Sequence, residues 1–245
     1  MADTVEHFKS LINEASNIVI LTGAGISTES GVPDFRSPGG LWEKFRTVEY
    51  GEYIESEEAR IEDWHRRFFM ADQIGQVEPN IGHTKIAEWI NAGKCSCLIT
   101  QNVDGLHLRG GVPQEKLIEI HGNATTASCI SCGEHHSIDT CRTLFEATSE
   151  SPKCQSCGGL IKADIVMFGE KMPVKKTAEA FKIAETADLF LAIGTSLVVN
   201  PAAGLPLHAK HNEAKFAIIN RDATGLDGYA DCVVNDEIGE VMTGL

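Results

Sequence analysis

The chain has 245 residues, of which 42% are hydrophobic and 23% charged, and it carries a formal net charge of −14. This composition is typical of a folded globular protein and excludes a mainly disordered or fibrous chain. The acidic charge argues against general affinity for nucleic-acid backbones. No apolar run reaches the roughly 18 residues that span a bilayer, and the opening MADTVEHFKS lacks an export pattern. We therefore expect a cytoplasmic protein without a nucleic-acid or membrane partner.

The first predicted elements are a helix over residues 4–16 and a buried strand over 18–21. Val5, Phe8 and Leu11 recur at helical spacing, and the apolar run IVIL follows. Further short apolar runs predict strands, and segments with helical periodicity lie between them. The later strands are 97–100, 117–120, 165–168, 189–193, 216–219 and 232–234, and the later helices are 83–92, 174–186 and 201–211. This alternation predicts an α/β fold with a doubly wound parallel sheet covered on both faces.

Two segments break the alternation and are interpreted as insertions that form a second, smaller domain. The first, 37–80, is rich in charged and aromatic residues, and the second, 129–157, contains four spaced cysteines.

A glycine turn, GAGIS at 23–27, follows the first predicted strand. Glycines at this place let the backbone approach a pyrophosphate at a helix N-terminus, but a tight strand-to-helix turn explains them equally well. Thr28 replaces the third glycine of the dinucleotide fingerprint, which disfavours a hydride-transferring enzyme. The continuation contains Phe35, suited to cover a flat ring, and Arg36, suited to grip a phosphate.

Polar residues follow four of the predicted strands. They are Gln101, Asn102 and Asp104 after the second strand, His121 after the third, Gly194, Thr195 and Ser196 further on, and then Asn220 and Arg221. Ligands of open parallel sheets bind at the carboxyl ends of the strands. The pattern therefore predicts a ligand site at this edge.

Two close cysteine pairs predict a metal site. Cys129 and Cys132 form the first pair, and Cys154 and Cys157 the second, with a glycine after each pair to permit a tight turn. This is the spacing of a four-thiolate zinc site, which leaves no open position for a substrate, so we expect one structural zinc ion. The other cysteines are expected to be plain thiols in a reducing compartment, with Cys141 as an alternative spare ligand.

Taken in order, the motifs closely resemble those of the sirtuin family, the NAD-dependent protein-lysine deacylases, over nearly the whole chain. They are GAGIS, SGVPDFR, TQNVDGLH, HG, the two CxxC pairs, IVMFGE, GTSLVVNPAAGLP and a late IN. The resemblance implies a Rossmann-like domain over 1–36, 81–126 and 160–245. It also implies a small domain made of a helical module over 37–80 and a zinc-ribbon module over 127–159. NAD would be a consumed co-substrate, and the partners would be acyl-lysine proteins or peptides.

The resemblance also implies which residues bind the cofactor. They are Gly23, Ala24 and Gly25 at the pyrophosphate; Asp34, Phe35 and Arg36 on a loop over the nicotinamide ribose; Gln101, Asn102 and Asp104 at the nicotinamide and ribose; Gly194, Thr195 and Ser196 at phosphate and the adenosine ribose; Asn220 and Arg221 at the adenosine end; and Cys232 near the adenine.

The catalytic residues implied by the resemblance are His121, Asn102 and Asp104. The acyl oxygen would attack the anomeric carbon of the nicotinamide ribose and expel nicotinamide, leaving an alkylamidate. His121 would then act as general base on a ribose hydroxyl, a role that suits an imidazole with an ordinary pKa of about 6.5. The products would be free lysine, nicotinamide and O-acyl-ADP-ribose.

The substrate backbone would pair as an added strand with two segments. Their residues are Val166, Met167, Phe168 and Gly169, together with Leu197 and Val198. A plain core strand is the alternative for 165–168.

The preferred acyl group is left open by one departure from the family pattern. A subgroup that prefers succinyl or malonyl lysine carries Tyr-x-x-Arg, whereas this chain has Trp64 and Arg67 at the nearest equivalent positions. An indole cannot replace the phenol hydroxyl in the same geometry, although Arg67 still suits a carboxylate. We therefore expect deacetylation, with longer apolar acyl groups, desuccinylation and demalonylation as alternatives.

Two further alternatives concern the class of function. An ADP-ribosyltransferase or NAD hydrolase would use the same pocket and differ in what captures the activated ribose. A zinc-ribbon module that only senses NAD would need no base, so His121 beside Asn102 and Asp104 argues against it.

Overall fold

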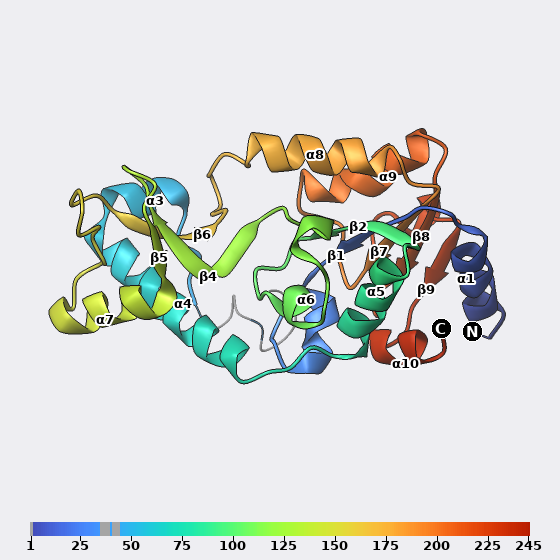
Figure 1. The fold of residues 1–245 in the computed structure, drawn as a ribbon, viewed down its shortest axis with the longest axis horizontal. Coiled ribbons are helices and arrows are strands. Elements are labelled where there is room, and N and C mark those ends of the chain that lie inside the picture. Colours follow the sequence, from blue (N-terminus) through green and yellow to red (C-terminus); the bar gives the residue numbers. More distant parts are fainter. Residues whose placement is uncertain (1, 35–39, 41–44) are drawn as a thin grey trace.

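The computed structural model describes residues 2–34, 40 and 45–245, arranged as two lobes along the long axis of the molecule (Figure 1). The larger lobe contains a six-stranded sheet in the order β3-β2-β1-β7-β8-β9, in which every neighbouring pair is parallel. Its strands are β1 (Ile18–Thr22), β2 (Cys95–Thr100), β3 (Leu117–Glu119), β7 (Leu189–Ile193), β8 (Lys215–Ile219) and β9 (Cys232–Val234).

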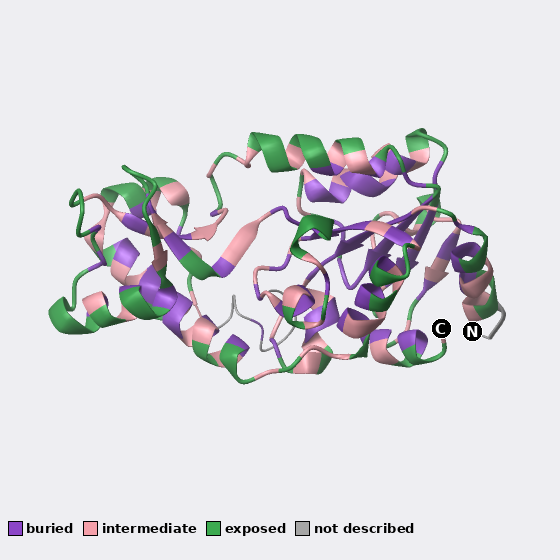
Figure 2. Ribbon diagram, viewed as in Figure 1, coloured by how far each residue is buried: buried purple, intermediate pink, exposed green. Residues whose placement is uncertain are grey.

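Helices cover both faces of this sheet, which explains why its strands are apolar on both sides. Successive residues of β1 belong to opposite cores, with Ile20 in one and Leu21 in the other. The first face is covered by α1 (Ala2–Glu14), α5 (Ile81–Asn91) and α10 (Ile238–Thr243), and the second by α8 (Val174–Ala184) and α9 (Leu205–His211). Figure 2 shows the central strands buried between these layers. The predicted doubly wound parallel sheet is confirmed.

Short helical segments complete the large lobe. They are α6 (Leu106–Arg109) and the 3₁₀ segments η1 (Ala24–Ser30), η2 (Gln114–Lys116), η3 (Ala202–Gly204) and η4 (Asp227–Tyr229). The helix predicted over 201–211 therefore divides into η3 and α9. Within the part of the chain that the structure describes, no helix is both long and apolar enough to cross a membrane.

The smaller lobe combines an antiparallel sheet, ordered β5-β4-β6, with the helices α3, α4 and α7 among the described residues. Its elements are β4 (Gly122–Cys129), β5 (His135–Ser137), β6 (Ile161–Ile165), α3 (Tyr50–Glu55), α4 (Glu57–Gly75) and α7 (Ile138–Thr148). Trp64, Phe68 and Phe145 form the aromatic part of its core, together with Cys129 and Cys154. The antiparallel sheet extends beyond residues 127–159 at both ends, and the predicted domain boundaries stay a prediction.

The predicted strand over 165–168 is wrong. Strand β6 ends at Ile165, and the next residues belong to neither sheet. Phe168 is 50% exposed, and its carbonyl accepts a hydrogen bond from the Tyr50 backbone N–H at 2.8 Å. This segment is apolar because it lines a cavity between the lobes rather than because it lies in a sheet core.

Candidate functional site

A cavity of about 480 Å³ lies where the carboxyl ends of the parallel strands meet the smaller lobe. Turns after β1, β2, β7 and β8 form one wall, and α4 and the segment 165–170 contribute the other. Most of the predicted site residues line it. They are Gly23, Ala24, Gly25, Asp34, Gln101, Asn102, His121, Val166, Met167, Phe168, Gly169, Gly194, Thr195, Ser196, Asn220 and Arg221.

The glycines of the turns after β1 and β7 allow these two turns to touch each other. The Gly25 N–H donates to the Gly194 carbonyl at 2.8 Å, and a Cβ on Gly25 would lie only 2.8 Å from that oxygen. Gly194 itself has a φ of +62°, and a Cβ there would lie 2.3 Å from the Ile26 nitrogen. Glycine is therefore required at both positions by backbone contact and, at Gly194, also by conformation.

A buried polar network lies behind the wall that follows β2. The Ser27 hydroxyl donates to the Asp104 carboxylate at 2.8 Å and accepts from the Asn102 amide at 3.1 Å. The other Asp104 oxygen accepts from the Leu106 N–H at 2.9 Å. Burial raises the pKa of Asp104, although these donors oppose the shift. Asp104 does not line the main cavity but a smaller adjoining hollow that Asn102 shares.

Two histidines that the sequence analysis did not assign to the site extend this network. His83 lies 3.4 Å from the Ser27 hydroxyl through Nε2, and His107 lies 2.9 Å from the Thr22 hydroxyl through Nε2. Burial lowers the pKa of His83 to about 4 and that of His107 well below its ordinary value, so both are neutral near pH 7. For His107, the sequence signal was its position in the polar run after β2. His83 had no comparable signal.

His121 is oriented by its neighbours on both sides. Its Nδ1 lies 3.2 Å from the Gln101 carbonyl, which can only accept, so Nδ1 carries the proton and Nε2 keeps a lone pair. Burial lowers the pKa of His121. The His121 carbonyl accepts from the Val166 N–H at 2.8 Å, and a Cβ on Gly122 would lie 1.9 Å from the Asp164 carbonyl. The glycine thus permits the close crossing that ties His121 to the segment 165–170.

The remaining predicted residues lie elsewhere. Leu197 is buried with a φ of +54°, and Val198 is 58% exposed outside the cavity lining. Cys232 is buried on β9, where its sulfur lies 3.6 Å from the Thr4 carbonyl of α1, so its place near the cofactor stays a prediction. Phe35 and Arg36 lie outside the described residues.

Trp64 and Arg67, the nearest equivalents of the Tyr-x-x-Arg pair, lie in different places. Trp64 is fully buried in the core of the smaller lobe and does not line the cavity. Arg67 lines the cavity, and so does Arg66, to which the sequence analysis gave no role.

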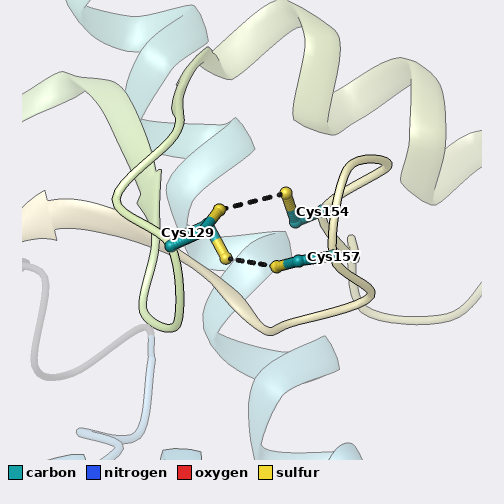
Figure 3. Close-up of side chains that lie close together, drawn as sticks. Cys129, Cys154 and Cys157 are labelled. Carbon is teal, nitrogen blue, oxygen red and sulfur yellow. Dashed lines mark hydrogen bonds between the residues drawn. The ribbon is translucent and has the colours of Figure 1, made fainter.

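The four paired cysteines form a cluster in the smaller lobe (Figure 3). The sulfurs of Cys129 and Cys157 lie 3.5 Å apart and those of Cys132 and Cys154 lie 3.7 Å apart. All four sulfurs lie within 4.8 Å of one another. A tetrahedral zinc site with bonds of about 2.3 Å has sulfurs about 3.8 Å apart, so the cluster fits this ion.

Both cysteine pairs sit on the same kind of turn. The Gly133 N–H donates to the Cys129 carbonyl and the Gly158 N–H to the Cys154 carbonyl, at 2.9 and 2.8 Å. Both glycines have positive φ, +76° and +73°, which explains the glycine after each pair. A set of four thiolates closed by two such turns suits a structural ion.

Comparisons with known proteins agree with this arrangement. The family model described as the Sir2 family matches residues 23–201. An NAD-dependent protein deacetylase of Rhodopseudomonas palustris is 45% identical, covering 99% of this chain and 96% of that protein. A solved complex described as Sir2, p53 peptide and NAD⁺ superposes with a TM-score of 0.89 at 33% identity, covering 98% of this chain and 96% of that one.

A second solved complex is described as Sir2 with a deacetylated p53 peptide and 3′-O-acetyl-ADP-ribose. It has a TM-score of 0.88 at 33% identity, again over 98% of this chain and 96% of that one. The sequence match, the shared fold and the matching order of motifs all agree: this chain belongs to the Sir2 family.

Proposed function

We propose that this chain removes acetyl groups from protein lysine side chains in an NAD-dependent reaction that yields nicotinamide and O-acetyl-ADP-ribose. The observation that carries the proposal is His121, whose unprotonated Nε2 belongs to the same cavity as the strand-end turns. Relatives and solved complexes named for protein deacetylation, NAD⁺ and acetyl-ADP-ribose support the reaction class.

The wall made by the strand ends is the proposed binding site for NAD. Gly23, Ala24 and Gly25 would lie along the pyrophosphate, and Asp34 would lie over the nicotinamide ribose. Gln101, Asn102 and Asp104 would form the nicotinamide pocket, with Ser27 holding the amide and the carboxylate in place. The remaining contacts would come from Gly194, Thr195 and Ser196 at phosphate and ribose, and from Asn220 and Arg221 at the adenosine end.

His121 is the proposed general base. Bound NAD supplies a ribose carbon that accepts the acyl oxygen as nicotinamide leaves. Because Nδ1 is fixed by the Gln101 carbonyl, Nε2 takes the proton from the attacking ribose hydroxyl. The lowered pKa of His121 keeps Nε2 available at neutral pH.

The acyl-lysine peptide is proposed to lie along the segment 166–169, with Leu197 and Val198 opposite. Phe168 and Val198 are exposed hydrophobic residues, as expected of a surface that a peptide covers. Pairing through the backbone would accept many peptide sequences. We place the reaction in the cytoplasm, because the four zinc ligands must remain reduced thiolates.

The test is incubation of the protein with an acetyl-lysine peptide and NAD, followed by mass spectrometry of peptide and nucleotide. We expect NAD-dependent loss of the acetyl mass and formation of O-acetyl-ADP-ribose. His121→Ala should lose turnover with its zinc content retained, whereas His211→Ala, at an exposed position on α9, should remain active. Free ADP-ribose, or ADP-ribose attached to protein, as the main product would instead support a hydrolase or an ADP-ribosyltransferase.

A further inference from the structure

The chain passes from the larger lobe to the smaller one at the turn that carries His121. Strand β3 ends at Glu119 and β4 begins at Gly122, so only residues 120 and 121 separate a parallel strand of one lobe from an antiparallel strand of the other (Figure 1). His121 therefore belongs to neither sheet, and contacts outside the two ladders must fix its backbone.

A pair of polar side chains spans this turn. The Asn123 Nδ2 donates to the Glu119 carboxylate at 2.6 Å. The Asn123 Oδ1 accepts from the backbone N–H and from the hydroxyl of Thr125, at 2.7 and 2.6 Å. The amide thus uses its donor and its acceptor at once and ties the end of β3 to the start of β4, with His121 between them. We call the bond between Glu119 and Asn123 the clasp.

Burial strengthens the clasp. Glu119 is only 9% exposed, although its side chain is a carboxylate. The Asn123 amide donates to that carboxylate, whereas the Lys176 ammonium bonds the Glu119 backbone carbonyl instead, at 3.4 Å. Burial raises the pKa of Glu119, and the bond from Asn123 opposes the shift. A charge-assisted bond shielded from water is stronger than an exposed one, which suits a contact that holds a turn in one geometry.

The clasp also lies against the turn that follows β2. The Ala124 N–H donates to the Val103 carbonyl at 2.9 Å. The Asn123 Nδ2 lies about as close to that turn, because a Cβ on Gly105 would be 4.0 Å from it. Displacement of Asn123 would therefore move His121 relative to the turn that forms the proposed nicotinamide pocket.

We propose that Glu119 and Asn123 are positioning residues for His121, and that their hydrogen bond holds the turn in the geometry in which Nε2 meets the ribose hydroxyl. The proposal rests on the proposed deacylase function and adds two residues to it. Neither side chain lines the cavity, so both act through His121 and not by contact with NAD or peptide. A reacting group must be held within about 0.5 Å of its productive position, which a two-residue crossing cannot ensure alone.

The two stages of the proposed reaction differ in their need for the base. Nicotinamide leaves as the acyl oxygen bonds to the anomeric carbon, and His121 acts only afterwards. Labelled nicotinamide can therefore attack the same carbon, break the new carbon–oxygen bond and restore labelled NAD and intact acetyl peptide without the base. A defect in positioning lowers deacetylation but not this exchange, whereas a defect in folding or NAD binding lowers both.

The test measures both rates in variants of the clasp. Asn123→Asp keeps the acceptor for Thr125 but sets two carboxylates against each other. We expect its kcat for deacetylation to fall about 10- to 100-fold, with the KM for NAD and the nicotinamide exchange unchanged. Glu119→Met, which removes the acceptor at similar size, should act in the same direction. Glu119→Gln, which keeps an acceptor oxygen, should remain active.

A double variant tests the bond itself. Glu119→Gln combined with Asn123→Asp reverses the bond, because the amide on β3 then donates to the carboxylate on β4. Deacetylation should return to within about threefold of the wild type, since the two changes are coupled. Asn212→Asp is the matched control, because Asn212 is exposed after α9, bonds the His208 carbonyl and lies outside the cavity lining, so neither rate should change.

Three results overturn the role of the clasp. They are unchanged deacetylation in both Asn123→Asp and Glu119→Met, a parallel loss of exchange and deacetylation, and absence of recovery in the folded double variant. If the variants at Asn123 do not fold, the comparison of Glu119→Met with Glu119→Gln decides by the same two rates. Absence of deacetylation in the wild type instead overturns the deacylase function on which the proposal rests.

Discussion

The two walls of the cavity are built in different ways. The wall of the larger lobe consists of turns that touch through backbone atoms, where Gly25 and Gly194 leave no space for a Cβ. The wall of the smaller lobe presents long side chains of α4, Arg66 and Arg67, held by one carboxylate. A Cβ added in the first wall displaces the backbone, whereas a change of side chain in the second wall alters the charge of the cavity and the ion pairs with Asp63.

The two lobes also differ in what stabilises them. The parallel sheet is enclosed by two apolar layers, whereas the smaller lobe packs one aromatic cluster against the cysteine site. Helix α4 is joined to α7 of the same lobe by Arg142, which donates to Asp72 and to the Phe68 carbonyl. The position of the α4 wall should therefore depend on zinc, and that of the strand-end wall should not.

Removal of zinc is expected to have the largest effect, and it should affect the two lobes differently. Chelation, or Cys154→Ser, should unfold the smaller lobe, because structural zinc contributes about 10–16 kcal/mol of binding free energy in small zinc-dependent domains. Hydrogen exchange should become fast in peptides from α4 and β4, while β1 and β7 stay protected. Deacylation should be lost together with the protection of α4.

Cys141→Ala is the matched control for this experiment. Cys141 is a buried thiol of the same lobe but lies outside the four-sulfur cluster, so the variant should keep one zinc per chain. Full activity in a zinc-free, folded protein would contradict a structural role for the ion.

The next effect concerns the strand-end wall. Gly194→Ala forces a left-handed conformation on alanine and places its Cβ against Ile26, at an expected cost of about 2–4 kcal/mol in the free energy of unfolding. The rise in Tm that NAD gives the wild type should disappear. Gly204→Ala, whose Cβ meets nothing closer than 3.9 Å, should keep that rise. Equal NAD responses in both variants would show that the turn contact is dispensable.

A smaller effect is the acid sensitivity that buried histidines give to the larger lobe. His83 has a pKa of about 4 in the folded protein, against an ordinary value of 6.5. The unfolded chain therefore binds the proton first, and stability falls as the pH falls from 6.5 toward 4. Between pH 7 and pH 5 this linkage amounts to about 2 kcal/mol.

Urea unfolding of the wild type and His83→Gln at both pH values measures this linkage. The wild type should lose about 2 kcal/mol more than the variant, because only the wild type binds a proton at residue 83 on unfolding. Equal losses would mean that His83 is not shielded from protonation.

The contrast between the strand-end wall and the α4 wall also explains which features the sequence could predict. The parallel strands were predictable because apolar runs mark strands buried on both faces, and the site turns follow strand ends in a fixed order. The segment 165–168 was misassigned because a cavity lining and a sheet core require the same residue types. The sequence spacing could not predict that Arg66 and Arg67 line the cavity while Trp64 lies in the core of the smaller lobe. The packing of α4 decides which of its side chains face the cavity.

The smallest expected effect is a displacement of the pH profile. His121 must be neutral to act as a base, and burial lowers its pKa below the ordinary 6.5 even though the Gln101 carbonyl opposes the shift. The acid limb of kcat/KM for an acetyl peptide should therefore be centred below pH 6.5, and the rate should fall tenfold per unit on that limb. Measuring the NAD-dependent rise in Tm at the same pH values separates this titration from weaker NAD binding. An acid limb centred at or above 6.5 would mean that the imidazole is solvated rather than buried, and the free Nε2 would then be unavailable to the ribose hydroxyl in mildly acidic solution.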